Sequence, residues 1–216
     1  MEPPAPGTPR QRAGSGRHPP LAQAPLAPGK KNAARLKAWI VFEDESGFSQ
    51  RPPIRATWAP RAQTPLIVEP FRWSTLSALG ALRTDPAGRR LRWYLACRRG
   101  TIRVPQLLTF LRDLKRHRRR RVLLVWDRLP GHRSRAVRLF LIENRHWLTV
   151  EWLPPYSPKL NPIELLWGHL DATTLVNTPV DDLRHLARRA RGGVRRVQAQ
   201  PCVGRGFLAH TGLFTY

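Results

Sequence analysis

The sequence predicts a mixed α/β fold, in which a sheet is flanked by helices and preceded by a disordered N-terminal arm. Short apolar runs bounded by proline or glycine dominate the first half, and they are typical of strands. In the second half, runs with apolar residues at helical spacing alternate with further strand-like runs. With 216 residues, 41% hydrophobic residues and eight tryptophans, the chain can form one substantial domain with a real core.

The N-terminal segment, residues 1–33, is rich in proline, glycine and alanine and has almost no bulky apolar side chains. Such a segment cannot bury enough surface to offset the entropy lost on ordering. We therefore expect a disordered basic arm, either a solvated tail or a segment that touches DNA. The folded domain is expected to occupy residues 34–216.

Strands are predicted first. The run 36–44 contains Ile, Val and Phe and ends at acidic residues, as a buried strand would. Segments 54–60 and 64–70 are bounded by prolines and are also interpreted as strands. Segments 74–83 and 89–97 flank the turn sequence TDPAG, which predicts a hairpin.

The first helix is predicted over residues 104–117, where leucines and a phenylalanine recur at helical spacing before a run of arginines. The remaining elements alternate: strands at 122–127 and 148–154, and helices at 134–145, 161–170 and 181–194. Ser134 and Asn161 are the predicted N-caps of two of these helices, and Pro162 suits the first helical position. The last helix is basic and is expected to end at its two glycines.

The composition limits the classes of partner and location. Lysine plus arginine outnumber aspartate plus glutamate 38 to 14, so that the net charge is +24 and the pI is about 11.8. This charge predicts a polyanionic partner, although a packaging protein that binds by charge alone would share it. The excess of arginine is also typical of a GC-rich genome. Two cysteines exclude a zinc cluster or disulfide framework, and no apolar run is long enough to span a membrane, so we expect a cytoplasmic protein.

Three acidic residues adjoin strongly apolar segments: Asp44, Asp127 and Glu164. Each also has an ordinary interpretation, as part of a solvated turn, as a salt-bridge partner, or as a helix N-terminal acid. A buried carboxylate is costly unless it is paired or binds a metal. In so basic a protein, the three together predict a divalent-cation site that faces an anionic substrate.

Four motifs then carry a family resemblance: FEDESGFSQRPPIRATWAPRAQTPLI, LLVWDRLPGHRS, LTVEWLPPYSPKLNPIELLWGHL and LVNTPVDDL. In order and spacing they resemble the DDE superfamily endonuclease domain of mariner-related bacterial insertion-sequence transposases, over roughly residues 36–190. The resemblance implies an RNase H-like fold and a triad of Asp44, Asp127 and Glu164 that binds two Mg²⁺ or Mn²⁺ ions. It also implies double-stranded DNA as substrate, cleavage at the element's ends followed by strand transfer into target DNA, cut-and-paste transposition, and a homodimer.

Further residues are expected to shape the site. Arg128, His132, Lys159 and Asn161 are candidate DNA contacts, although His132 would also suit an ordinary loop. The proline-rich loop 154–158 is expected to present Asn161 and Glu164. The tryptophans of two motifs, at positions 58 and 167, are interpreted as core aromatics, with base stacking as the alternative.

The sequence departs from the family pattern at three places. Arg128 follows the second acid where relatives carry a small or amide residue, and Asp171 stands where they tend to carry lysine. No helix-turn-helix region precedes the first strand, which predicts the catalytic half of a split or truncated transposase, nucleoid-associated in a bacterium, with a separately encoded helix-turn-helix subunit. The alternatives are a catalytically inactive remnant that only binds DNA, and a cellular RNase H-like nuclease.

Overall fold

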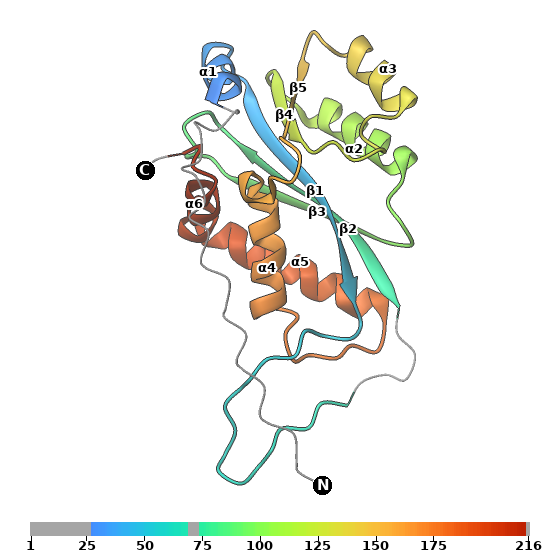
Figure 1. Cartoon of the computed structure of the whole chain (residues 1–216), viewed down its shortest axis with the longest axis vertical. Helices are drawn as coiled ribbons and strands as arrows, with labels where there is room; N and C mark the ends of the chain where they lie inside the picture. Colours follow the sequence, from blue (N-terminus) through green and yellow to red (C-terminus); the bar gives the residue numbers. More distant parts are fainter. Residues whose placement is uncertain (1–26, 69–73, 215–216) are drawn as a thin grey trace, which may run out of the picture.

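A computed structural model describes residues 27–68 and 74–214, with side chains from residue 30 onward. Its centre is a five-stranded sheet in the order β3-β2-β1-β4-β5 (Figure 1). The strands are β1 (Trp39–Ser49), β2 (Thr75–Thr84), β3 (Arg92–Arg99), β4 (Val122–Trp126) and β5 (Leu148–Trp152). The helices are α1 (Ala27–Arg35), α2 (Val104–His117), α3 (Arg135–Glu143), α4 (Pro162–Thr173), α5 (Leu183–Ala199) and α6 (Pro201–His210), with a short 3₁₀ turn η1 (Pro158–Leu160) before α4.

The sheet is mixed, as predicted. β1, β2 and β3 follow one another in the sequence and pair antiparallel. β4 follows α2 and pairs parallel to β1, and β5 follows α3 and pairs parallel to β4. Parallel pairing requires a crossover connection, here a helix, because the chain must return to the end of the sheet at which the neighbouring parallel strand begins. The alternation of helix and strand in the second half of the sequence therefore sets this part of the topology.

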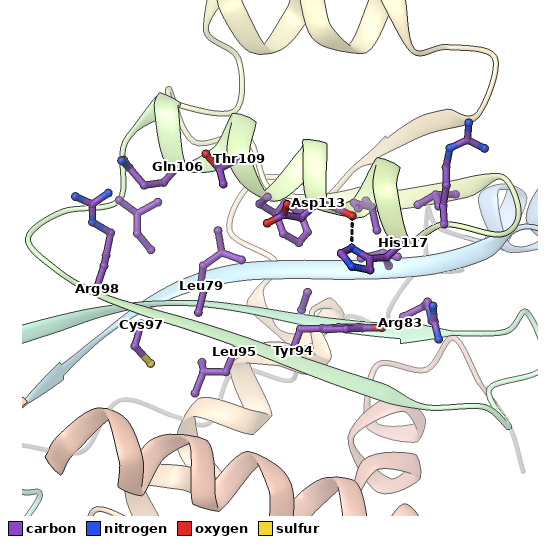
Figure 2. A pocket seen from close by; sticks show the side chains of 18 of the residues that line it. Leu79, Arg83, Tyr94, Leu95, Cys97, Arg98, Gln106, Thr109, Asp113 and His117 are labelled. Atoms are coloured by element: carbon purple, nitrogen blue, oxygen red, sulfur yellow. Dashed lines mark hydrogen bonds between the residues drawn. The ribbon is translucent and has the colours of Figure 1, made fainter. Parts of the chain in front are cut away.

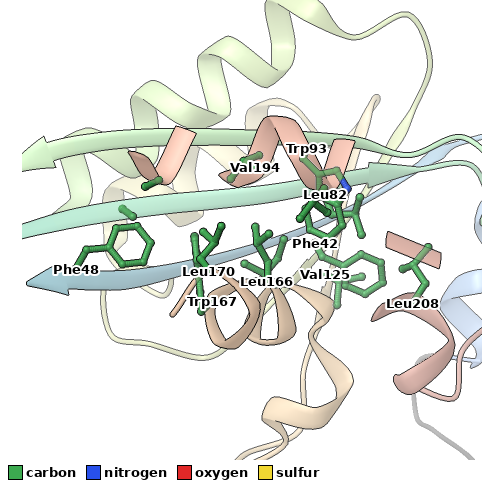
Figure 3. Close-up of a cluster of buried hydrophobic side chains, with 14 of the residues drawn as sticks. Phe42, Phe48, Leu82, Trp93, Val125, Leu166, Trp167, Leu170, Val194 and Leu208 are labelled. Carbon is green, nitrogen blue, oxygen red and sulfur yellow. The ribbon is translucent and has the colours of Figure 1, made fainter. Parts of the chain in front are cut away.

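Each face of the sheet is covered by helices and has its own core. Side chains such as Phe42, Leu82 and Val125 pack with Leu166 and Leu208 from the C-terminal helices (Figure 3). On the other face, a second cluster joins the sheet to α2 and α3. The alternation of side chains along β1 assigns neighbouring residues to opposite faces, which decides the direction of every polar side chain in that strand.

On the second face, α2 leaves part of the sheet uncovered. A hollow of about 580 Å³ lies between α2 and strands β2 and β3, lined by apolar side chains such as Leu79, Ile102 and Phe110 (Figure 2). Residues at its rim include His117, whose Nδ1 lies 2.8 Å from the carbonyl oxygen of Asp113. None of the predicted site residues lines this hollow.

The two strands predicted at 54–60 and 64–70 are wrong. Residues 54–68 form no strand, and 69–70 lie outside the described residues. The segment extends away from the sheet as a long loop between β1 and β2 (Figure 1). Its prolines lack the N–H group that a strand ladder needs. Trp58 is 100% exposed, so its assignment to the core is also wrong.

The helices near both ends of the described chain differ from those predicted. α1 includes residues 27–33 of the expected disordered arm, and Ala33 is buried; residues 1–26 lie outside the described part of the chain. α5 does not end at its glycines but continues to Ala199, and α6 follows it unpredicted. A Cβ on Gly193 would lie 2.4 Å from Leu170 Cδ2, so this glycine permits the close approach of α5 to α4. Within the described ranges, no helix has the length and apolar character needed to cross a membrane.

Candidate active site

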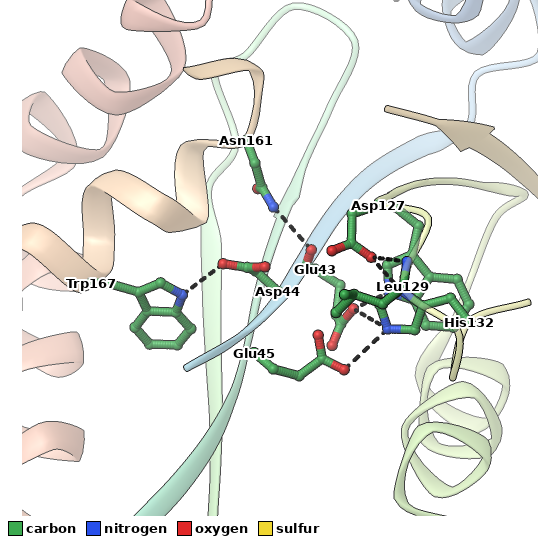
Figure 4. A network of polar contacts seen from close by, with 9 residues as sticks. Glu43, Asp44, Glu45, Asp127, Leu129, His132, Asn161 and Trp167 are labelled. Carbon is green, nitrogen blue, oxygen red and sulfur yellow. Dashed lines mark hydrogen bonds and ion pairs between the residues drawn. The ribbon is translucent and has the colours of Figure 1, made fainter. Parts of the chain in front are cut away.

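Asp44 lies within β1, not at its end as predicted, because the strand continues to Ser49. It pairs with Gly80 of β2, and its side chain lies on the sheet face that α4 covers (Figure 4). One carboxylate oxygen, Oδ2, accepts a hydrogen bond of 2.8 Å from Trp167 Nε1. Trp167 is buried, as expected of a core aromatic, and it also orients the first acid.

Asp127 follows directly after β4, as predicted. β4 runs parallel to β1 with Phe42 opposite Val125, so Asp44 and Asp127 each stand two residues beyond this pair, at the same level of the sheet. The Oδ1 atom of Asp127 accepts a hydrogen bond of 3.1 Å from the Leu129 amide. It also lies 2.5 Å from His132 Nδ1.

Glu164 lies in the first turn of α4, and Asn161 fixes the position of that turn. Asn161 is the N-cap, as predicted, since its Oδ1 accepts from the Ile163 amide at 3.2 Å. Its Nδ2 donates to the carbonyl oxygen of Glu43 at 3.1 Å (Figure 4). One buried side chain thus caps the helix and attaches its start to β1 next to Asp44, which places Glu164 beside the strand.

Each of the three acids lies near enough to another to influence its pKa. The pKa of Asp44 is raised to about 7, first by burial and then by the nearby carboxylates of Glu164, Glu45 and Asp127, although the Trp167 hydrogen bond opposes the rise. Burial and the charge of Asp127 raise the pKa of Glu164. These carboxylates, brought together from β1, β4 and α4, repel one another.

Asp127 behaves differently from the other two acids. Burial alone would raise its pKa, but hydrogen bonds from His132 and the Leu129 amide, together with the charge of His132, outweigh burial and lower the pKa. Asp127 is therefore the acid that most readily stays ionised. The three oxygen-bearing groups, with unrelieved repulsion around Asp44, fit a hard divalent cation, which prefers carboxylate ligands.

A second cluster, which the sequence interpretation missed, lies on the opposite side of β1. Glu43, Glu45 and His132 offer ligand atoms within 4.8 Å of one another. His132 Nε2 lies 3.0 Å from Glu45 Oε1 and 3.9 Å from Glu43 Oε2. Trp126 donates a hydrogen bond to Glu43 through its Nε1 and stacks on the His132 ring, with centroids 4.0 Å apart. Within the described chain, Glu43 Oε1 and Glu45 Oε2 are buried and have no hydrogen-bond partner.

This cluster neutralises its own charge. Although burial lowers the pKa of His132, hydrogen bonds to Asp127 and Glu45 and the charges of both glutamates outweigh burial and raise the pKa to about 10. The imidazole is thus protonated at neutral pH, and an imidazolium has no free lone pair for a metal. Burial, with the charge of Glu45, raises the pKa of Glu43 well above its usual range. In this arrangement His132 links the two glutamates to Asp127 and holds that carboxylate in place.

One sequence signal could have revealed this second cluster. In a strand, alternate residues share a face, so Glu43 and Glu45 of FEDES must point away from Asp44. Two carboxylates on that face, opposite Asp44, require a cationic partner there. His132 of PGHRS, five residues after Asp127, is that partner.

The four predicted DNA contacts fall into two pairs. His132 and Asn161 are only 1% and 3% exposed and serve internal hydrogen bonds, which argues against direct DNA contact. Arg128 and Lys159 are exposed and stay predicted contacts. Arg128 Nε donates to the Leu153 carbonyl oxygen at 3.2 Å, and within the described residues no ion pair joins Arg128 to Asp127. The ionic partner of Asp127 is His132.

Comparisons with known proteins bear on the same residues. A family model described as DDE superfamily endonuclease matches residues 39–187, which include all three acids. The chain is 28% identical over 165 residues to the insertion element IS630 uncharacterized 39 kDa protein of Shigella sonnei; the match covers 75% of this chain and 46% of that protein. The chain thus spans about half the length of this curated relative.

Solved structures share the fold. The Mos1 transposase paired-end complex with the left transposon end is similar with a TM-score of 0.53 and 20% identity, over 95% of this chain and 68% of that one. The mariner Mos1 paired-end complex with Mg is similar with a TM-score of 0.50 and 20% identity, over the same shares of both chains. The predicted mixed sheet flanked by helices is confirmed. Because the family model covers more than half of the sequence, the chain belongs to the DDE superfamily endonuclease family.

Proposed function

We propose that this chain is the catalytic domain of a transposase that cleaves DNA and joins a DNA 3′-end to a new site. The convergence of Asp44, Asp127 and Glu164 carries the proposal, since three separate elements bring mutually repelling carboxylates together in a protein of net charge +24. Membership of the endonuclease family and the likeness of fold to transposase structures bound to transposon ends support it.

Asp44, Asp127 and Glu164 would hold the divalent cations, for which we propose two Mg²⁺ or Mn²⁺ ions. When bound, such ions activate the attacking oxygen and stabilise the leaving oxygen of a phosphodiester. A structural neighbour was solved as a complex with Mg, which agrees with this choice of metal. Relief of the repulsion around Asp44 favours cation binding once this carboxyl group has lost its proton.

The other residues of the site prepare these three groups. Trp167 holds one oxygen of Asp44 and leaves the second available. His132 keeps Asp127 ionised and fixes its orientation, which limits the rearrangement needed when the cation and substrate arrive. Arg128 and Lys159, both exposed, would neutralise phosphate charge on the DNA.

The test uses duplex oligonucleotides that carry the inverted repeats flanking the gene, with a free 3′-end already exposed, in Mg²⁺ or Mn²⁺. We expect metal-dependent strand transfer that is lost in Asp44→Ala, Asp127→Ala and Glu164→Ala. Asp113→Ala is the matched control, because Asp113 lies on the exposed surface of α2 in an ion pair with Arg116. Full activity of Asp127→Ala would contradict the proposal.

The same assay separates the alternatives. A remnant that only binds DNA would retain salt-sensitive binding in every variant and produce no cleaved or joined strand. A cellular nuclease would cut generic duplexes without a strand-transfer product. Two further parts of the proposal, the homodimer and a separately encoded helix-turn-helix subunit that recognises the element's ends, are tested by light scattering and by adding the neighbouring gene product to the reaction.

A further inference from the structure

Helix α5 presents an unusually basic surface. Its 17 residues include six arginines and no acidic residue, and its apolar side chains face α4 and the sheet. In Figure 1, α5 crosses α4, the helix that carries Glu164. Toward the C-terminal end of α4, the helix surface contains a hollow of about 330 Å³, lined by Thr174, His185, Arg188, Arg189, Gly192 and Arg196.

The hollow exists because position 192 has no side chain. The lining residues of α5 recur at spacings of three, four and seven, so they share one side of the helix. A Cβ on Gly192 would meet only Arg196 Nη1, at 3.8 Å, which leaves open space among cationic side chains. Glycine costs helix stability, so its presence at an open, partly exposed position calls for another explanation.

Two of the arginines are held in place. Arg189 Nη2 donates to the Thr174 carbonyl oxygen at 2.7 Å and to Thr178 Oγ1 at 3.2 Å. Arg196 Nη2 donates to Thr174 Oγ1 at 2.9 Å. In the described chain, Arg189 Nε has no hydrogen-bond partner. The guanidinium groups are therefore oriented in advance, which lowers the entropy lost when they bind a ligand.

Among the residues that the structure describes, no acid lines the hollow. The nearest acid along α5 is Asp182, the N-cap, whose carboxylate accepts from the His185 amide at 2.6 Å. Backbone hydrogen bonds to His185 and Arg184 and the charges of Arg188 and His185 lower the pKa of Asp182, in spite of desolvation. The Asp182 carboxylate therefore interacts with the first turn of α5, and the side chains that line the hollow remain cationic.

We propose that this hollow binds a phosphate group of the DNA backbone, as a subsite separate from the acidic triad. Guanidinium forks match the geometry of phosphate oxygens, and a cluster of arginines with no acid is the surface that phosphate favours. The identification of the ligand as DNA rests on the proposed function. The shared chemistry is a phosphate oxyanion, which free inorganic phosphate could also supply.

The position of the hollow suits a long polyanion. Thr174 follows α4 ten residues after Glu164, and at 1.5 Å per residue this corresponds to about 15 Å along the helix. At about 3.4 Å per base pair, the same duplex would pass both places within four to five base pairs. Capping of the α4 C-terminus accounts for Arg189 and Arg196, but it accounts neither for Arg188 and His185 nor for the missing side chain at Gly192.

The first test fills the hollow without changing any charge. Gly192→Leu is compared with Gly206→Leu, since Gly206 also lies on an exposed helix position with open space around it but outside the hollow. Binding of a fluorescent 20-base-pair duplex is measured by anisotropy in EDTA at several salt concentrations. We expect Gly192→Leu to weaken affinity about tenfold, the loss of one charge-assisted contact. The slope of log association constant against log salt concentration is negative, and its magnitude should decrease by about 0.9.

The second test removes charge and keeps the proposal testable if Gly192→Leu does not fold. Arg188→Gln should reproduce both effects, whereas Arg195→Gln, on the same helix but outside the hollow, should produce smaller ones. Equal losses for the two arginine variants, or unchanged binding by folded Gly192→Leu, would overturn the proposal. Competition by millimolar inorganic phosphate that is identical in wild type and Gly192→Leu would also overturn it. Because binding is measured without metal, this result does not depend on catalysis, so failure of the catalytic proposal and failure of the phosphate subsite can be told apart.

Discussion

Gly80 tests how tightly the site is built into the core. It lies opposite Asp44 in the β1–β2 pair. A Cβ at this position would lie 2.4 Å from Trp167 Cη2 and 2.7 Å from its Cζ2, with Ile163 Cγ2 at 3.2 Å. These atoms belong to a rigid ring and a buried helix, so Gly80→Ala forces the indole to move. The same indole donates the hydrogen bond that orients Asp44.

The magnitude follows from a matched substitution. Gly47, in the neighbouring strand β1, has nothing within 4 Å of the place that an added methyl group would take, so Gly47→Ala should stabilise the strand by about 0.5–1 kcal/mol. Gly80→Ala has the same backbone advantage but adds an overpacking penalty of about 1–3 kcal/mol. We therefore expect the free energies of unfolding of the two variants to differ by about 1–3 kcal/mol, with Gly80→Ala less stable.

Urea unfolding followed by far-UV circular dichroism measures this difference, and calorimetric titration with Mn²⁺ measures the effect on the site. Gly80→Ala should bind the cation more weakly than wild type, because displacement of Trp167 releases Asp44. Gly47→Ala should bind normally. If Gly80→Ala were as stable as Gly47→Ala and bound Mn²⁺ equally well, the packing of Trp167 against β2 would not control the site.

The other predictions concern charge and helix packing. His132→Ala should lower the free energy of unfolding by about 3–5 kcal/mol, since it leaves buried carboxylates without their cationic partner. The exposed His146→Ala should change the free energy of unfolding little. Because the pKa of His132 is raised to about 10 in the folded protein, the loss of stability in His132→Ala should be full below the unfolded-state pKa of histidine and should vanish as the pH rises through 10. Because the pKa of Asp44 is about 7, Mn²⁺ affinity should rise about tenfold between pH 6 and pH 8, and a flat titration profile would contradict this. Gly193→Ala should destabilise the protein by about 1–3 kcal/mol in thermal melts, whereas Gly192→Ala should stabilise it by up to about 1 kcal/mol; changes of the same sign would refute the packing described for α5.

Local sequence signals located most of the regular elements. The hairpin of β2 and β3, the helix α2 and the N-caps Ser134 and Asn161 are where the sequence predicts them, because turn residues, apolar spacing and capping side chains act over a few residues. The loop between β1 and β2 was misjudged, since β-branched residues such as Ile54 and Val68 suit a strand but found no neighbouring strand to pair with.

The sequence by itself determined that three acids adjoin apolar elements in a strongly basic chain, and its motifs identified the family. Only the tertiary structure decided how these acids are arranged: the parallel register of β1 and β4 puts Asp44 and Asp127 at the same level of the sheet, and Asn161 attaches the start of α4 to β1. The tertiary structure alone also paired His132 with Glu43 and Glu45. It likewise decided that α5 continues past its glycines and packs closely against α4 at Gly193. The physical reason is that these contacts join residues far apart along the chain, so their energies depend on packing and burial rather than on local propensity.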